Sequence, residues 1–185
     1  MRVIGGIARG TKLYTLNGLE TRPTLDRIKE SLFNIIQFKV KDAVILDLFS
    51  GSGALSIESL SRGANYAFLC DFSKDAINII KKNLEKTKFV SKTELKQMEF
   101  KRYLSFLNES EKKFDIIFLD PPYNTNYIYI ATKIILEYKL LNKNGIIVAE
   151  TDELDRVLEE IKSLNIKIKD IRKYGRVKLL FLEEI

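Results

Sequence analysis

Two kinds of apolar pattern alternate along this chain of 185 residues. Continuous apolar runs, which are typical of strands buried on both faces, occupy residues 44–47, 66–71, 114–119 and 145–150, and a more polar strand is expected at 93–98. Between them, apolar residues recur every three or four positions, which predicts helices at 21–36, 54–58, 75–88, 103–107, 127–138 and 153–164. Strands that alternate with helices predict an α/β fold built on a doubly wound, mainly parallel sheet.

The two ends of the chain depart from this alternation. Residues 2–15 hold two short apolar runs around three glycines, which predicts a small N-terminal β-hairpin. Residues 165–171 and 176–182 predict two strands joined around Tyr174 and Gly175. The second is almost entirely apolar from Leu179, so we expect it to be inserted inside the sheet. We expect a single domain over 1–185, with a basic hairpin and helix extension over 1–40 and the main body over 41–185.

The charge of the chain is uneven. The net charge is +6 and the sequence pI is about 9.2. In the first 42 residues, eight basic side chains outnumber four acidic ones. A basic extension is typical of proteins that bind a polyanion, although a lysine-rich composition without a target gives the same balance.

Composition also excludes several classes of chemistry. The chain has no histidine, so Ser-His-Asp and Cys-His catalysis and zinc sites built on imidazole are excluded, and we expect no metal. The single cysteine, Cys70, lies in an apolar run and is expected to be a small buried side chain. No apolar run approaches the roughly 18 residues that would span a membrane, and no secretory signal is evident. We therefore expect a cytoplasmic protein that contacts no membrane.

A glycine turn follows the first buried run. Asp47 ends that run and leads through Phe49 to Gly51 and Gly53, where the next helix begins. Glycine lets the main chain bend sharply and approach a ligand closely. A dinucleotide-binding fingerprint would place a third glycine at Ser56, so a nicotinamide-dependent oxidoreductase is disfavoured. Asp47 precedes the turn, where a carboxylate is better suited to an amino group than to a diphosphate.

Acidic residues also follow the next two strands. Asp71 comes 18 residues after Gly53, and an acid at that place can accept both hydroxyls of a ribose. Glu99 follows the strand at 93–98. Because parallel strands end at the same edge of a sheet, these carboxylates are expected to lie close together.

The most apolar run ends in Asp120-Pro121-Pro122-Tyr123. Proline brings no N–H to a sheet and restricts the residue before it, so the strand must stop there. Asp120 is thus left at the carboxyl end of a strand, where open α/β sheets bind ligands, and Tyr123 adds an aromatic ring beside it. Taken alone, the four residues fit an ordinary strand exit with a solvated aspartate equally well.

Basic and hydroxyl side chains gather at the start of the first helix. Arg22, Thr24 and Arg27 lie where free backbone N–H groups and the helix dipole favour anions. Arg2 and Arg9 flank the glycines of the expected hairpin. We expect these five side chains to contact a nucleic acid, while helix capping and solvent-facing charge remain the alternative interpretation.

Three blocks in order across the chain resemble the RsmD family of bacterial 16S ribosomal RNA guanine-N2 methyltransferases. They are Arg22-Pro23-Thr24 with its following helix, Phe49 to Leu55, and Asp120 to Tyr123. The resemblance implies a Rossmann-like class I fold, with a seven-stranded mainly parallel sheet and one antiparallel strand. It implies that S-adenosyl-L-methionine is bound by Asp47, Phe49, Gly51, Gly53, Asp71 and Glu99. Asp71 stands where the family commonly has a glutamate. Glu99 stands where the family commonly has an aspartate near the adenine.

The same resemblance implies methylation of one guanine of 16S rRNA, within the 30S subunit or an assembly intermediate, by a monomer. It makes that RNA the nucleic acid expected at Arg2, Arg9, Arg22, Thr24 and Arg27. Asp120 and the carbonyl of Pro121 would accept hydrogen bonds from the guanine amino group, Pro122 would complete the turn, and the ring of Tyr123 would stack on the extruded base. Guanine presents N1–H and N2–H side by side, which suits an acceptor-only carboxylate. Adenine-N6 methyltransferases of DNA or RNA carry the same four residues, so that activity stays open, as does a non-catalytic RNA-binding assembly factor.

Overall fold

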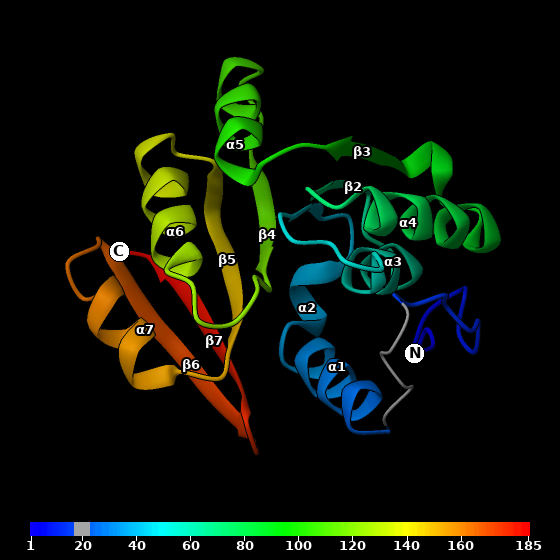
Figure 1. Ribbon diagram of the computed structural model, residues 1–185, viewed down its shortest axis with the longest axis horizontal. Helices are drawn as coiled ribbons and strands as arrows, with labels where there is room; N and C mark the ends of the chain where they lie inside the picture. The colour runs from blue at the N-terminus through cyan, green and yellow to red at the C-terminus, as the bar shows by residue number, and fades with distance from the viewer. Residues whose placement is uncertain (17–22) are drawn as a thin grey trace.

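The computed structural model describes residues 1–16 and 23–185 and contains one seven-stranded sheet in the order β3-β2-β1-β4-β5-β7-β6 (Figure 1). The strands are β1 (Val44–Asp47), β2 (Tyr66–Asp71), β3 (Thr93–Gln97), β4 (Phe114–Leu119), β5 (Leu141–Thr151), β6 (Ile166–Tyr174) and β7 (Val177–Glu184). The helices are α1 (Pro23–Ile35), α2 (Gln37–Val40), α3 (Ala54–Ser61), α4 (Lys74–Thr87), the 3-10 turn η1 (Val90–Lys92), α5 (Phe100–Glu109), α6 (Tyr127–Glu137) and α7 (Leu154–Ile161).

The first five strands run parallel, and β7 runs antiparallel to both of its neighbours, β5 and β6. The apolar run from Leu179 is buried because β7 lies inside the sheet. The expected fold class, a mainly parallel seven-stranded sheet with one inserted antiparallel strand, is confirmed.

Each face of the sheet carries its own apolar layer. Alternate residues of the central strands point to opposite faces, so Ile116 and Phe118 of β4 belong to one layer and Ile117 and Leu119 to the other. Helices α1, α3 and α4 cover the first layer, and α5, α6 and α7 cover the second (Figure 1). Both layers leave the carboxyl ends of β1, β2 and β4 at one edge of the sheet.

Several boundaries differ from the sequence-based expectation. The two N-terminal strands are reduced to one antiparallel bridge between Arg2 and Lys12, so residues 1–16 form a loop and not a regular hairpin. The reason is that the N–H groups of Ile4 and Gly5 donate to the carboxylate of Glu58 instead of to a partner strand. Helix α5 is longer than the expected 103–107, because Glu99 caps its N-terminus by accepting hydrogen bonds from two backbone N–H groups.

Within the described ranges, 1–16 and 23–185, none of the helices has the length and apolar character needed to cross a bilayer. The buried position of Cys70 agrees with the expectation from the sequence.

Candidate active site

A cavity of about 870 Å³ opens at the carboxyl ends of β1, β2 and β4. Ten residues were predicted to serve the reaction and the cofactor, and eight of them line this one cavity. These eight are Phe49, Gly51, Asp71, Glu99, Asp120, Pro121, Pro122 and Tyr123. Its volume lies within the range of cavities that enclose small ligands. The topology therefore brings together residues that are up to 74 positions apart in the chain, from Phe49 to Tyr123.

Asp47 and Gly53 lie behind the wall of this cavity. Asp47 is 1% exposed, and its Oδ2 accepts a hydrogen bond of 2.8 Å from the hydroxyl of Ser56. Burial raises the pKa of Asp47 to about 7, and the charge of Asp71 acts in the same direction. Gly53 begins α3 with a φ of 76°, a left-handed conformation that favours glycine. In this structure both residues shape the turn.

Asp71 joins the glycine turn to the end of β2. Its Oδ2 accepts a hydrogen bond of 2.8 Å from the N–H of Gly51, and its Oδ1 accepts one of 2.8 Å from the N–H of Ser73. A carboxylate offers about four lone-pair positions, so these two bonds orient the group and leave acceptor capacity for a ligand. Because Asp71 lines the cavity, its position suits the recognition of vicinal hydroxyls.

Aromatic side chains complete the wall, and three of them, Phe72, Phe100 and Tyr127, were not among the predicted site residues. The rings of Phe49, Phe100 and Tyr127 form a cluster with centroid distances of 5.1, 6.0 and 5.0 Å. Phe72, which directly follows Asp71, is 76% exposed and also lines the cavity. In the sequence, the signal for Phe72 was only a large apolar side chain directly after the acid that ends a strand. Phe100 and Tyr127 are each the first residue of a helix that follows a strand. An aromatic residue at such a position is not by itself a sign of a ligand site.

Asp120, Tyr123 and Glu150 form an acidic group at the rim. Leu119 of β4 lies beside Ala149 of β5, so Asp120 and Glu150 follow at neighbouring strand ends. The hydroxyl of Tyr123 donates a hydrogen bond of 3.0 Å to Oε1 of Glu150, which holds a ring that is 42% exposed. Glu150 was not among the predicted site residues, although it ends a buried run as Asp120 does.

The electrostatics of this group favour proton acceptance. Asp120 is exposed within the cavity, yet the protein that surrounds it on the other sides removes part of its hydration. This desolvation, together with the charges of Glu150 and Asp47, raises the pKa of Asp120 well above its ordinary value. Burial and the charge of Glu150 likewise raise the pKa of Tyr123, so its hydroxyl stays protonated and donates to Glu150.

The basic N-terminal residues gather elsewhere. Arg2, Arg9 and Arg27 line a second cavity of about 620 Å³ between the N-terminal loop and α1, and in the described chain its lining shares no residue with the first cavity. Arg2 is 64% exposed and forms an ion pair of 3.2 Å with Asp26. Arg22 and the side chain of Thr24, both predicted to contact RNA, lie outside the described residues.

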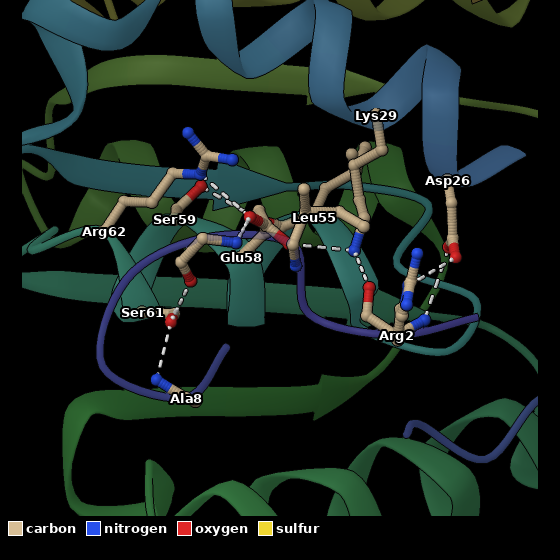
Figure 2. A network of polar contacts seen from close by, with 11 residues as sticks. Arg2, Ala8, Asp26, Lys29, Leu55, Glu58, Ser59, Ser61 and Arg62 are labelled. Atoms are coloured by element: carbon tan, nitrogen blue, oxygen red, sulfur yellow. Dashed lines mark hydrogen bonds and ion pairs between the residues drawn. The ribbon is translucent and has the colours of Figure 1, made fainter. Parts of the chain in front are cut away.

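A buried ion-pair network, which the sequence analysis missed, anchors this loop (Figure 2). Glu58 of α3 is fully buried and accepts hydrogen bonds of 2.8 Å from Ile4 N, 2.8 Å from Gly5 N, 2.9 Å from Lys29 Nζ and 2.8 Å from Arg62 Nε. Lys29 also donates to the carbonyl of Arg2 at 2.6 Å. The network therefore fastens the loop, α1 and α3 to one another.

Known proteins with similar sequences identify the family of this chain. A family model described as "Conserved hypothetical protein 95" matches residues 1–183. The chain belongs to that family. Its relatives in the Conserved hypothetical protein 95 family include "Ribosomal RNA small subunit methyltransferase D" of Haemophilus influenzae, which is 37% identical over 155 residues, or 83% of this chain and 79% of the relative. The resemblance to RsmD proteins is thus confirmed.

Solved structures agree with the family assignment. The Escherichia coli protein yhhF is 26% identical and superimposes with a TM-score of 0.85, covering 100% of this chain and 97% of the other. It is described as a predicted methyltransferase. The protein SMU.776, which is also described as a predicted methyltransferase and was solved in complex with SAH, is 18% identical with a TM-score of 0.70, covering 84% of this chain and 48% of the other. The second likeness concerns the fold alone. The fold of this Conserved hypothetical protein 95 member is that of S-adenosylmethionine-dependent methyltransferases.

Proposed function

We propose that this protein transfers a methyl group from S-adenosyl-L-methionine to the exocyclic N2 amino group of a guanine in 16S ribosomal RNA. The observation that carries the proposal is that Asp120 and Tyr123 lie at the rim of a cavity that also holds Asp71 and the glycine turn. A relative with 37% identity is named as a small-subunit ribosomal RNA methyltransferase, which supports RNA of that subunit as the substrate.

The lining residues fit the cofactor in chemical terms. The carboxylate of Asp71, oriented by Gly51, would accept hydrogen bonds from the ribose hydroxyls. The side chains of Phe72 and Phe100 offer apolar surface for the adenine, and Glu99 lies beside them. When bound, S-adenosyl-L-methionine supplies an electrophilic methyl group carried by a sulfonium.

Asp120 and the Pro121 carbonyl provide the acceptors that the target amino group needs. The lone pair of the guanine N2 is delocalised into the ring, so the amino group is a weak nucleophile. An ionised Asp120, with the carbonyl of Pro121, would accept its N–H groups, direct the lone pair into the cavity and stabilise the positive charge that develops on nitrogen. The raised pKa of Asp120 strengthens it as an acceptor for the proton released after transfer.

Tyr123 would support an extruded base. A guanine inside a paired stem cannot present its amino group to the cavity, so the base must be unpaired or flipped. The hydrogen bond to Glu150 fixes the tyrosine ring, and a ring held at the rim can stack on the base and replace part of the lost stacking.

The test is incubation of the protein with methyl-labelled S-adenosyl-L-methionine and either naked 16S rRNA or 30S particles, followed by nucleoside analysis. We expect N2-methylguanosine as the labelled product. N6-methyladenosine as the sole product would contradict the choice of base, and calorimetry without heat on addition of S-adenosyl-L-methionine would contradict methyl transfer altogether. We propose that the reaction takes place in the cytoplasm, where ribosomal subunits are assembled.

A further inference from the structure

The tip of the β6–β7 hairpin is the most basic short segment outside the N-terminal extension. Residues 172–178, called the hairpin tip below, read Arg-Lys-Tyr-Gly-Arg-Val-Lys and contain four basic side chains and no acidic one. None of them was assigned to RNA from the sequence, where this segment was treated only as a connection between two strands.

Strand topology places the hairpin tip at the edge of the sheet that carries the candidate active site. Lys178 of β7 lies opposite Thr151, the last residue of β5, because these strands are antiparallel. Thr151 follows Glu150, whose carboxylate binds the hydroxyl of Tyr123. The hairpin tip therefore lies one strand away from the rim at which the target base would be held.

Two charges of the hairpin tip face each other unfavourably in the free protein, whereas Arg172 is paired with Asp170 at 2.8 Å. Lys173 lies directly opposite Lys178 across the two strands, and like charges in such pairs are destabilising. The Lys178 ammonium donates to the carbonyl of Asp152 at 2.8 Å, and the Arg176 guanidinium lies 3.4 Å from Oδ2 of Asp152. The Arg176 side chain is 90% exposed, so this ion pair contributes little. An anionic partner would relieve the repulsion that remains.

A second contact connects the hairpin tip with the basic N-terminal surface. The hydroxyl groups of Tyr174 and Ser31 are hydrogen-bonded, which connects the hairpin with α1. Arg27, one helical turn before Ser31, is exposed and lines the cavity that also contains Arg2 and Arg9. The contact between Tyr174 and Ser31 thus brings the hairpin tip next to the helix that carries Arg27, although Asp26 and Glu30 of α1 divide the positive charge there.

We propose that the hairpin tip, through Lys173 and Arg176, binds the phosphate backbone of the substrate RNA beside the target nucleotide. This inference rests on the proposed function and adds a second contact region to the N-terminal one. RNA is favoured as the occupant because the phosphates next to a base held at the rim can reach the exposed cations of the hairpin tip, one strand away.

The test compares the double variant Lys173→Gln/Arg176→Gln with the matched control Lys81→Gln/Lys82→Gln, which removes the same charge from exposed positions on α4. Figure 1 shows α4 at the opposite end of the sheet from β6 and β7. Affinity for a labelled 16S rRNA transcript is measured by fluorescence anisotropy as a function of KCl concentration. Thermal unfolding and heat of S-adenosyl-L-methionine binding confirm that both variants are folded.

Each phosphate contact contributes about 0.7–0.9 to the slope of log affinity against log salt. We expect the hairpin-tip variant to have a slope lower in magnitude by about 1.4–1.8, and an affinity reduced roughly 25- to 60-fold at 0.1 M salt, with the difference vanishing near 1 M. The control should have a salt slope and an affinity closer to those of the wild type. If the two variants give the same slope while the wild type still methylates RNA, the inference is wrong and the proposed function stands. If the wild type binds neither the transcript nor 30S particles at any salt concentration, both are wrong.

Discussion

Replacing Lys29 with methionine removes the ammonium group at the centre of the buried network around Glu58. Lys29 is 5% exposed and its Nζ lies 2.9 Å from Oε2 of Glu58 and 2.6 Å from the carbonyl of Arg2. Methionine has a similar length and packs well, so the change is chiefly the loss of charge and of two hydrogen bonds. Glu58 then keeps one cation, Arg62, which is 20% exposed.

Breaking a buried ion pair by removing one partner costs about 3–5 kcal/mol, because the other charge stays buried. Since Arg62 and two backbone N–H groups still bind Glu58, we expect a loss near the lower limit, about 3 kcal/mol. For a chain of this length, each kcal/mol shifts the melting temperature by about 2–4 °C, which gives a decrease of roughly 6–12 °C. Urea unfolding followed by circular dichroism measures the free energy directly. Lys82→Met, at an exposed position on α4, serves as the control and should stay within about 0.5 kcal/mol of the wild type.

The pH dependence provides a second test of the same reasoning. Burial alone would raise the pKa of Glu58, but the charge of Lys29 and hydrogen bonds from the loop outweigh it and bring the pKa below its ordinary value. A carboxylate with a lowered pKa in the folded state stabilises the protein fully above its unfolded pKa, and this contribution is lost as the pH falls through the folded pKa. The difference between wild type and Lys29→Met should therefore narrow below about pH 4.5. A loss under 1 kcal/mol at pH 7, or a difference that does not change with pH, would refute the account.

Four further predictions concern the cavity and the N-terminal loop. Asp120→Ala should abolish methyl transfer and leave calorimetric affinity for S-adenosyl-L-methionine nearly unchanged, whereas an equal loss of both would assign Asp120 to the cofactor. Glu150→Gln keeps an acceptor for the tyrosine hydroxyl and removes a charge that raises the pKa of Asp120, so the acid side of the pH–rate profile should move to lower pH; an unmoved profile would separate the two carboxyl groups. Asp71→Ala should weaken cofactor binding by at least tenfold in calorimetry, because hydrogen bonds to charged groups contribute about 1.5–3 kcal/mol; unchanged affinity would contradict its role. Gly6→Ala should lower the melting temperature, because a Cβ there would lie 1.7 Å from the carbonyl oxygen of Ser61, and a variant as stable as the wild type would show that the loop can move away.

The fold and the main cavity could be predicted because their signals are local. Buried runs that end in Asp71 and in Asp120 mark strands by their own composition, and the carboxyl ends of parallel strands meet at one edge. The inserted strand was also recognisable, because an apolar run from Leu179 has to be covered on both faces. Eight of the ten predicted residues lie at one cavity for this reason.

What the sequence did not reveal depends on contacts between distant segments. The residues around Glu58 do not distinguish it from an ordinary glutamate on a helix. Only the fold brings the N-terminal loop and Lys29 within hydrogen-bonding distance of it. Asp47 was expected at the ligand, but its side chain points to Ser56, since burial beneath the turn is set by how α3 packs. Glu150 acquires its partner from another strand's loop.

The inserted strand has a consequence for biosynthesis. In the described chain β7 follows every other element, yet it pairs with both β5 and β6. While the protein is being synthesised, β5 keeps an unpaired edge until β7 has emerged from the ribosome, and an open edge of this kind invites pairing with other nascent chains. We therefore expect molecules interrupted before residue 177 to require chaperones and to aggregate, even though the parallel half of the sheet is already complete.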